Sequence, residues 1–142
     1  MYEYSCKIVR VVDGDTVDVD IDLGFGIIYA NQRIRLYGID TPESRTRDPI
    51  EKKFGKLASR FLAESLGETS VLRTRLDSKG KYGRILGEFL VYDAKTDRQM
   101  TVNEIMIRDH LAVAYHGQSK DDIEDEHLRN RKILIEEHGF EA

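Results

Sequence analysis

The sequence predicts an α+β protein that is mainly β: a five-stranded barrel with about three helices. Three observations support this prediction. Five runs of strand length are rich in apolar and β-forming residues, turn signals separate several of them, and a run of helical period lies between the third and the fourth. With 142 residues the chain is long enough to bury one core. We therefore expect residues 1–142 to form a single domain.

The first three predicted strands lie within the first 37 residues. Residues 4–12 are rich in apolar and β-forming side chains, and Asp13-Gly14 after them is a hairpin signal. Residues 16–23 alternate between polar and apolar side chains, with aspartate at three of the four polar positions, which predicts a strand with one face in solvent. Gly24-Phe25-Gly26 predicts a turn, and residues 27–37 the third strand.

The alternation also predicts where four aspartates point. Side chains two residues apart share a face of a strand, so Asp15 lies on the apolar face at the rim of the core. Asp18, Asp20 and Asp22 lie on the opposite face, and we expect them to be solvated.

A loop is expected over residues 38–49, because Thr-Pro and Asp-Pro steps interrupt any regular pattern there. From Ile50 the apolar residues follow a helical period, and Gly67 has the position of a C-cap. Residues 70–76 and 85–92 then predict two further strands.

Two more helices are expected near the C-terminus. Thr101 and Glu104 have the spacing of a capping box, which predicts a helix to about His110. A last helix begins near Ser119, with acidic residues first and basic residues later, in the order that the helix dipole favours. The order β-β-β-α-β-β-α-α matches the small Greek-key barrel known as the OB-fold.

Composition limits the classes of function. The chain has a net charge of −4, but residues 41–90 hold 11 Lys/Arg against 7 Asp/Glu, so a local basic surface can coexist with an acidic total.

No run approaches the roughly 18 apolar residues of a membrane span, and no signal peptide precedes the first strand, so we expect a cytoplasmic protein without a membrane partner. Cys6 is the single cysteine, which we expect to be a buried or edge thiol and which argues against a zinc site based on cysteine.

Three short motifs carry the candidate chemistry. They are Asp13-Gly14-Asp15-Thr16, the run from Arg35 to Glu43 that includes Asp40-Thr41-Pro42, and Lys81-Tyr82-Gly83-Arg84. Carboxylates beside a hydroxyl residue suit a hard cation that prefers oxygen ligands. Two separate arginines suit a phosphate, because a guanidinium can meet two of its oxygens at once.

In order and spacing these motifs resemble those of the staphylococcal (micrococcal) nuclease family, and His127-Leu128-Arg129 in the last helix adds a fourth match. The resemblance covers roughly residues 5–132. It implies an OB-fold phosphodiesterase that hydrolyses DNA and RNA with Ca²⁺, leaves 3′-phosphate and 5′-hydroxyl ends, and acts as a monomer.

The resemblance also assigns roles to individual residues. It implies three groups: the metal ligands Asp15, Asp40 and Thr41, the last through its carbonyl; the catalytic residues Arg35, Glu43 and Arg84; and the substrate-binding residues Lys81, Tyr82 and Tyr115. Glu43 would hold or deprotonate the attacking water, and the two arginines would clamp the phosphate. A second tyrosine of the family pattern is Gly117 here, which would weaken packing on the base.

Two other classes of function compete with this reading. One is a catalytically silent module of the same fold that binds nucleic acid or protein, and the other is an ordinary single-strand-binding OB-fold. The retained acidic and arginine positions favour catalysis, and the absence of tryptophan, with only 12 aromatic residues, argues against the single-strand binder. His110, His116, His127 and His138 are expected to be surface or capping residues.

Overall fold

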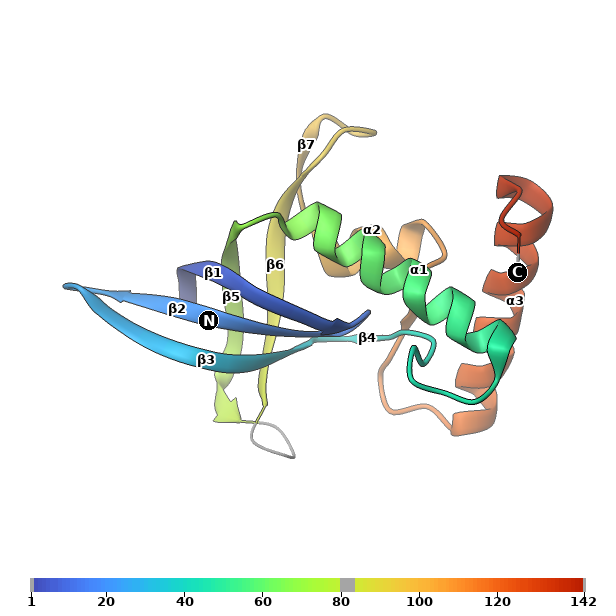
Figure 1. Ribbon diagram of the computed structural model, residues 1–142, viewed down its shortest axis with the longest axis horizontal. Helices are drawn as coiled ribbons and strands as arrows, with labels where there is room; N and C mark the ends of the chain where they lie inside the picture. Colours follow the sequence, from blue (N-terminus) through green and yellow to red (C-terminus); the bar gives the residue numbers. More distant parts are fainter. Residues whose placement is uncertain (1, 80–83, 142) are drawn as a thin grey trace.

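The computed structural model describes residues 2–79 and 84–141, and Figure 1 shows the arrangement of its elements. In chain order these elements are β1 (Tyr2–Asp13), β2 (Thr16–Gly24), β3 (Ile27–Leu36), β4 (Ile39–Asp40), α1 (Pro49–Leu66), β5 (Thr69–Lys79), β6 (Ile85–Asp93), β7 (Arg98–Thr101), α2 (Val102–Arg108), β8 (Val113–Ala114) and α3 (Lys120–His138).

Five strands close into a barrel. Their order is β3-β2-β1-β5-β6, all antiparallel neighbours, and a short parallel pairing of β3 with β6 joins the two ends, with Ile34 opposite Ile85. β7 extends the sheet on the other side of β6. With α1 placed between the third and fourth barrel strands, this is the topology of an OB-fold, and the predicted fold class is confirmed.

The alternation in β2 has the expected effect. Val17, Val19 and Ile21 are buried in the barrel core, whereas Asp22 is exposed. The other two aspartates of the solvent face have partners: Asp18 pairs with Arg33, at 2.8 Å from Oδ1 to Nε, and Asp20 accepts a hydrogen bond from the backbone of β3. The strand therefore has one apolar and one wet face, as the sequence predicts.

Local sequence signals fix both ends of α1. The Asp48 side chain accepts hydrogen bonds from the Ile50 and Glu51 amides, and Pro49 occupies the first helical position. Gly67 ends the helix with a φ of 64°, as expected of a C-cap. Phe54, Ala58 and Leu62 face the barrel, and Figure 1 shows α1 lying across one end of it.

Three short strands were not expected from the sequence. β7 extends the barrel sheet, and β4 and β8 pair with each other as a separate two-stranded ladder, with Asp40 opposite Val113. The predicted loop 38–49 therefore contains a strand of two residues. This pairing holds the segment after α2 beside the segment after β3.

The long β2–β3 hairpin extends away from the helices, and α3 stands at the opposite end of the molecule (Figure 1). In the described part of the chain no helix is long and apolar enough to cross a membrane. Cys6 is buried, with 2% of its surface exposed, and its thiol donates to the Ser70 carbonyl at 3.4 Å, as expected of a buried thiol.

Candidate functional site

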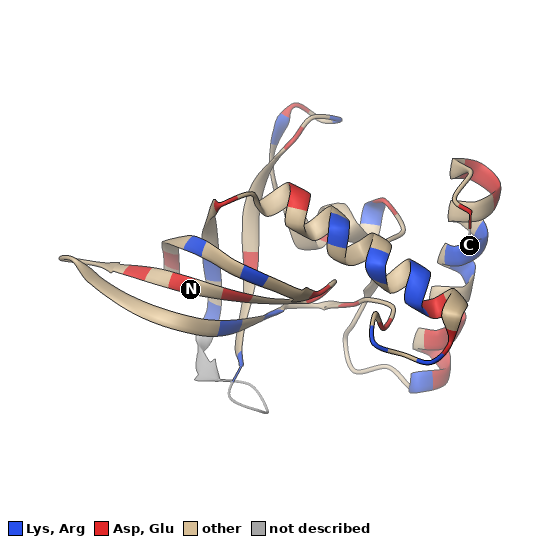
Figure 2. Ribbon diagram, viewed as in Figure 1, with Lys and Arg blue, Asp and Glu red and all other residues tan. Residues whose placement is uncertain are grey.

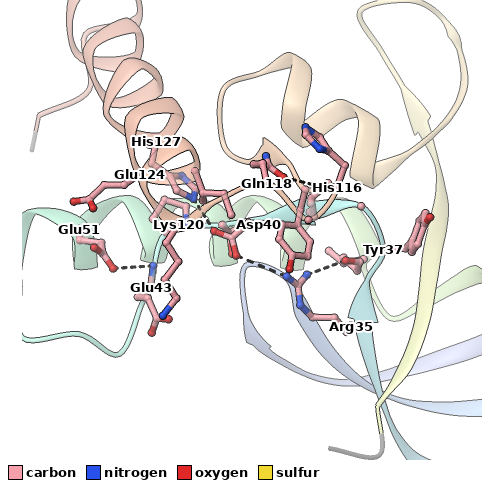
Figure 3. Close-up of a pocket in the computed structure, with 18 of the residues that line it drawn as sticks. Arg35, Tyr37, Asp40, Glu43, Glu51, His116, Gln118, Lys120, Glu124 and His127 are labelled. Carbon is pink, nitrogen blue, oxygen red and sulfur yellow. Dashed lines mark hydrogen bonds and ion pairs between the residues drawn. The ribbon is translucent and has the colours of Figure 1, made fainter. Parts of the chain in front are cut away.

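Arg35 is the centre of the site. It lies at the end of β3, where its Nη1 donates to the Leu36 carbonyl at 2.8 Å. Its Nη2 lies 3.5 Å from Asp15 Oδ2, and it lies 3.8 Å from Asp40 Oδ1, as Figure 3 shows. Asp15 Oδ2 and Asp40 Oδ1 therefore lie no farther from each other than the sum of their distances to Arg35 Nη2. One arginine thus gathers two carboxylates that lie 25 residues apart in the sequence.

The β1–β2 turn places Asp15. Gly14 in this turn is buried, and a β-carbon there would lie 2.8 Å from Ala58 Cβ and 2.9 Å from Thr41 Oγ1. Only glycine allows the turn to approach α1 and Thr41 so closely. The Asp15 carboxylate then accepts a hydrogen bond from the backbone amide of Thr41, at 3.4 Å.

The turn also sets the charge state of its two aspartates. Burial raises the pKa of Asp15, but the Arg35 guanidinium and hydrogen bonds from Asp13, Thr16 and Thr41 outweigh burial, and the net effect lowers that pKa. The pKa of Asp13 is raised to about 6, by burial and by the Asp15 carboxylate. As the pH falls, Asp13 therefore takes up a proton near pH 6, while Asp15 stays ionised.

The loop carrying Glu43 is held against α1. The Glu43 amide donates to Glu51 Oε2 at 3.3 Å, and Glu51 Oε1 lies 3.7 Å from Arg131 Nη2 of α3. At Gly55 a β-carbon would lie 2.5 Å from the carbonyl carbon and oxygen of Glu43. The backbone that carries Glu43 therefore packs directly on the helix, while its side chain is exposed and faces the cleft.

His127 was placed wrongly by the sequence analysis. It is neither a surface residue nor a cap: its side chain is only 12% exposed, and its Nε2 lies 2.8 Å from Asp40 Oδ2 (Figure 3). A carboxylate can only accept, so the imidazole Nε2–H donates. Asp40 is thus held from both sides, by Arg35 and by His127. The spacing within the chain gives no signal for this contact, which spans 87 residues.

These groups line a cleft of about 1070 Å³ between the barrel, the β4–β8 ladder and α3. Of the predicted site residues in the described part of the chain, the following line it: Arg35, Asp40, Thr41, Glu43, Arg84 and Tyr115. Asp15 lies next to the cleft without lining it. Tyr115 is 47% exposed, and its amide donates to the Gly38 carbonyl at 2.8 Å, which places it beside β4. Lys81 and Tyr82 lie outside the described residues.

The donor set suits a hard cation better than zinc. Within residues 2–79 and 84–141 no three His, Cys, Asp or Glu side chains form a metal-binding cluster. The Asp15 and Asp40 carboxylates converge beside Arg35, and carboxylate oxygens, carbonyl oxygens and water are the ligands that Ca²⁺ takes in its loose geometry. The donor chemistry of Asp15 and Asp40 is therefore compatible with a calcium ion.

A family model described as staphylococcal nuclease homologue matches residues 33–134, more than two thirds of the chain. The chain belongs to this family. The match begins within β3 and ends in α3, so it includes every residue that lines the cleft, whereas Asp15 and its turn precede it.

Individual relatives agree with this assignment. The chain is 33% identical over 124 residues to the protein ParB of Escherichia coli, covering 84% of this chain and 63% of ParB. It is 38% identical over 83 residues to a thermonuclease of Staphylococcus intermedius, covering 58% of this chain and 46% of the relative. It is 31% identical over 121 residues to a micrococcal nuclease of Shigella flexneri, covering 83% and 62%. The chain thus spans about half to two thirds of the length of these relatives.

Proposed function

We propose that this protein is a calcium-dependent nuclease that hydrolyses phosphodiester bonds in DNA and RNA. The observation that carries the proposal is the pair of carboxylates, Asp15 and Asp40, held beside Arg35 at a cleft that Glu43 and Arg84 also line. Family membership and relatives named thermonuclease and micrococcal nuclease support it. We further propose that residues 1–142 act as one monomeric domain.

In this proposal Asp15, Asp40 and the Thr41 carbonyl would hold the calcium ion. A bound calcium ion would polarise a phosphoryl oxygen and help to orient water. His127 and Arg35 keep Asp40 in place from opposite sides, which limits the rotation of the carboxylate. Such outer contacts orient ligands and tune the affinity of the site.

Glu43 takes the proton of the attacking water. The water oxygen forms a bond to phosphorus while the bond from phosphorus to the 5′ oxygen breaks, which leaves a 3′-phosphate and, after protonation of the leaving oxygen, a 5′-hydroxyl. A positioned general base contributes typically about 10²–10⁴ in rate. The hydrogen bond from the Glu43 amide to Glu51 and the close packing at Gly55 keep this carboxylate at the cleft.

Arg35 and Arg84 stabilise the charge that builds on the equatorial oxygens in the transition state. Arginines directed at a reacting phosphoryl group can contribute about 10³ or more in rate. Tyr115, half exposed in the cleft, provides an aromatic face for a base, and stacking of this kind contributes roughly 1–3 kcal/mol per base. Lys81 and Tyr82, which lie outside the described residues, are proposed to contact the substrate.

The test is cleavage of end-labelled single-stranded DNA, duplex DNA and RNA with calcium, with calcium plus a chelator, and with magnesium alone. We expect cutting with calcium, none with the chelator, and products that accept a new 5′-phosphate from a polynucleotide kinase. The absence of cutting under every condition, with oligonucleotide still bound, would instead identify a silent binding module.

A further inference from the structure

A basic surface lies outside the cleft, on the loop that precedes α1 and on the exposed side of α1. Residues 44–60 hold six Lys/Arg against two Asp/Glu, although the whole chain has a net charge of −4. All six cations are exposed. They are Arg45, Arg47, Lys52, Lys53, Lys56 and Arg60. Figure 2 shows blue segments along this loop and along α1.

These cations lack the carboxylate partners that other basic residues have. Four arginines on the strands and α2 each form an ion pair: Arg33 with Asp18, Arg73 with Glu3, Arg75 with Glu88, and Arg108 with Asp93. Across residues 2–79 and 84–141, none of the six cations of the basic surface forms an ion pair with the protein. The two acids of the segment are engaged elsewhere, since Asp48 caps α1 and Glu51 binds the Glu43 amide.

The position of the lysines makes their lack of partners more costly. Lys52 and Lys53 lie near the N-terminus of α1, where the positive end of the helix dipole disfavours cations. Lys53, Lys56 and Arg60 follow each other at intervals of three and four residues, so they share the face of α1 that points away from the barrel. At 1.5 Å per residue they span about 10 Å, which is roughly three nucleotides of a strand that rises 3.4 Å per phosphate.

The basic surface is continuous with the cleft. Burial alternates along the loop, with Glu43, Arg45 and Arg47 exposed and Ser44 and Thr46 half-buried, so the exposed side chains lie on one side of it. Glu43 lines the cleft. A strand that leaves the cleft past Glu43 would therefore meet the two arginines first and the cations of α1 next.

We propose that this basic surface binds the phosphate backbone of a nucleic-acid strand beyond the nucleotides held in the cleft. The proposal rests on the proposed nuclease function and extends it, because it predicts a preference for long substrates. A membrane surface fits less well, since a membrane-binding helix carries a broad apolar face beside its cations. The exposed face of α1 has Ile50 as its large exposed hydrophobic residue among the described ones.

The test is binding of a fluorescent oligothymidylate of about 16 nucleotides, the upper site size of one OB-fold, in the presence of a chelator that prevents cutting. The variant K53Q/K56Q/R60Q removes three charges while keeping residues of similar helix propensity. We expect its affinity at low salt to fall at least tenfold. We also expect the slope of log affinity against log salt concentration to become less steep by about 2, because each contact to a single strand contributes about 0.7.

A matched control removes three exposed cations from other elements. K7Q/R98Q/K132Q has the same net charge as the test variant but alters β1, β7 and α3. We expect its affinity to stay within twofold of the unmodified protein. Equal losses in the two triple variants would overturn the proposal, because they would reflect total charge alone.

Two further measurements separate the causes of failure. The variant R45Q/R47Q leaves α1 intact and should make the slope of log affinity against log salt concentration less steep by about 1. The proposal can therefore still be tested if the triple variant does not fold. Calcium-dependent cutting by the unmodified protein is measured beside binding. If the unmodified protein cuts and the variants bind as tightly as it does, the proposed role of the basic surface is overturned and the nuclease function stands. If the unmodified protein neither binds nor cuts, both proposals are overturned.

Discussion

Replacement of Gly55 with alanine perturbs the packing between α1 and the loop that carries Glu43. In an exposed helix interior this change stabilises by about 1 kcal/mol, because alanine has the higher helix propensity. Here the new β-carbon would lie 2.5 Å from the Glu43 carbonyl carbon and oxygen and 2.6 Å from the Ser44 nitrogen. All three are backbone atoms, so no side-chain rotation can relieve the contact.

The size of the effect follows from these distances. Ordinary van der Waals contact begins at 3.4 Å, so the loop has to move away from Gly55 by about 0.9 Å. Inserting a methyl group into a packed site costs about 1–3 kcal/mol, which exceeds the gain in helix propensity. We therefore expect a net loss of up to about 2 kcal/mol in the free energy of unfolding. A displacement near 1 Å can reduce a rate about 10²-fold, so kcat should fall by a comparable factor.

The assay pairs urea unfolding with cleavage under calcium saturation. Glu64→Ala is the matched control, because Glu64 is an exposed position on the same helix and its replacement should change stability by no more than about 0.5 kcal/mol. A Gly55→Ala protein that is more stable by about 1 kcal/mol and keeps its full kcat would refute the reasoning, since the loop would then not be held at Gly55.

Three further predictions concern other contacts. His127→Ala removes the hydrogen-bond donor to Asp40 and should weaken calcium binding about 10–100-fold, as measured by calorimetric titration. His127→Gln should lose less calcium affinity, because its amide can still donate. Equal calcium affinities of the two variants would contradict a role for this hydrogen bond. Hydrogen bonds from Arg108 and Thr96 lower the pKa of Asp93, so the ionised carboxylate stabilises the fold above the usual aspartate pKa near 4. This contribution is lost as the pH falls below that value. Asp93→Asn should therefore flatten this part of the acid-unfolding curve, and an unchanged curve would count against the ion pair of Asp93 with Arg108. Burial raises the pKa of Cys6 to about 11, so a thiol reagent at neutral pH should react only on unfolding, and rapid labelling of the folded protein would be inconsistent with the buried thiol.

The fold could be predicted largely because its signals are local. Alternation in β2, the capping aspartate and proline of α1 and the glycine at its end each act within a few residues, and the structure confirms them. The order of these elements then restricts the topology to few candidates, of which the OB-fold is one.

What could not be predicted depends on contacts between distant parts of the chain. The two-residue strands β4 and β8 are too short to show a period, yet their pairing places Tyr115 beside Gly38, at the cleft that Asp40 also lines. The contact of His127 with Asp40 and that of Arg131 with Glu51 depend on how α3 docks against the barrel. The sequence of α3 gives little guidance, because this helix is strongly charged and buries only Leu134 among its described residues.

The most direct test of the central claim is the single-turnover cleavage rate of a defined oligonucleotide at saturating calcium, for the unmodified protein and for Glu43→Gln. Glutamine keeps the size and polarity of the side chain but cannot take a proton from water. We predict a rate reduced about 10²–10⁴-fold, with calcium and oligonucleotide affinities changed by no more than a few-fold. An unchanged rate in Glu43→Gln would contradict the assignment of Glu43 as the proton acceptor in this cleft.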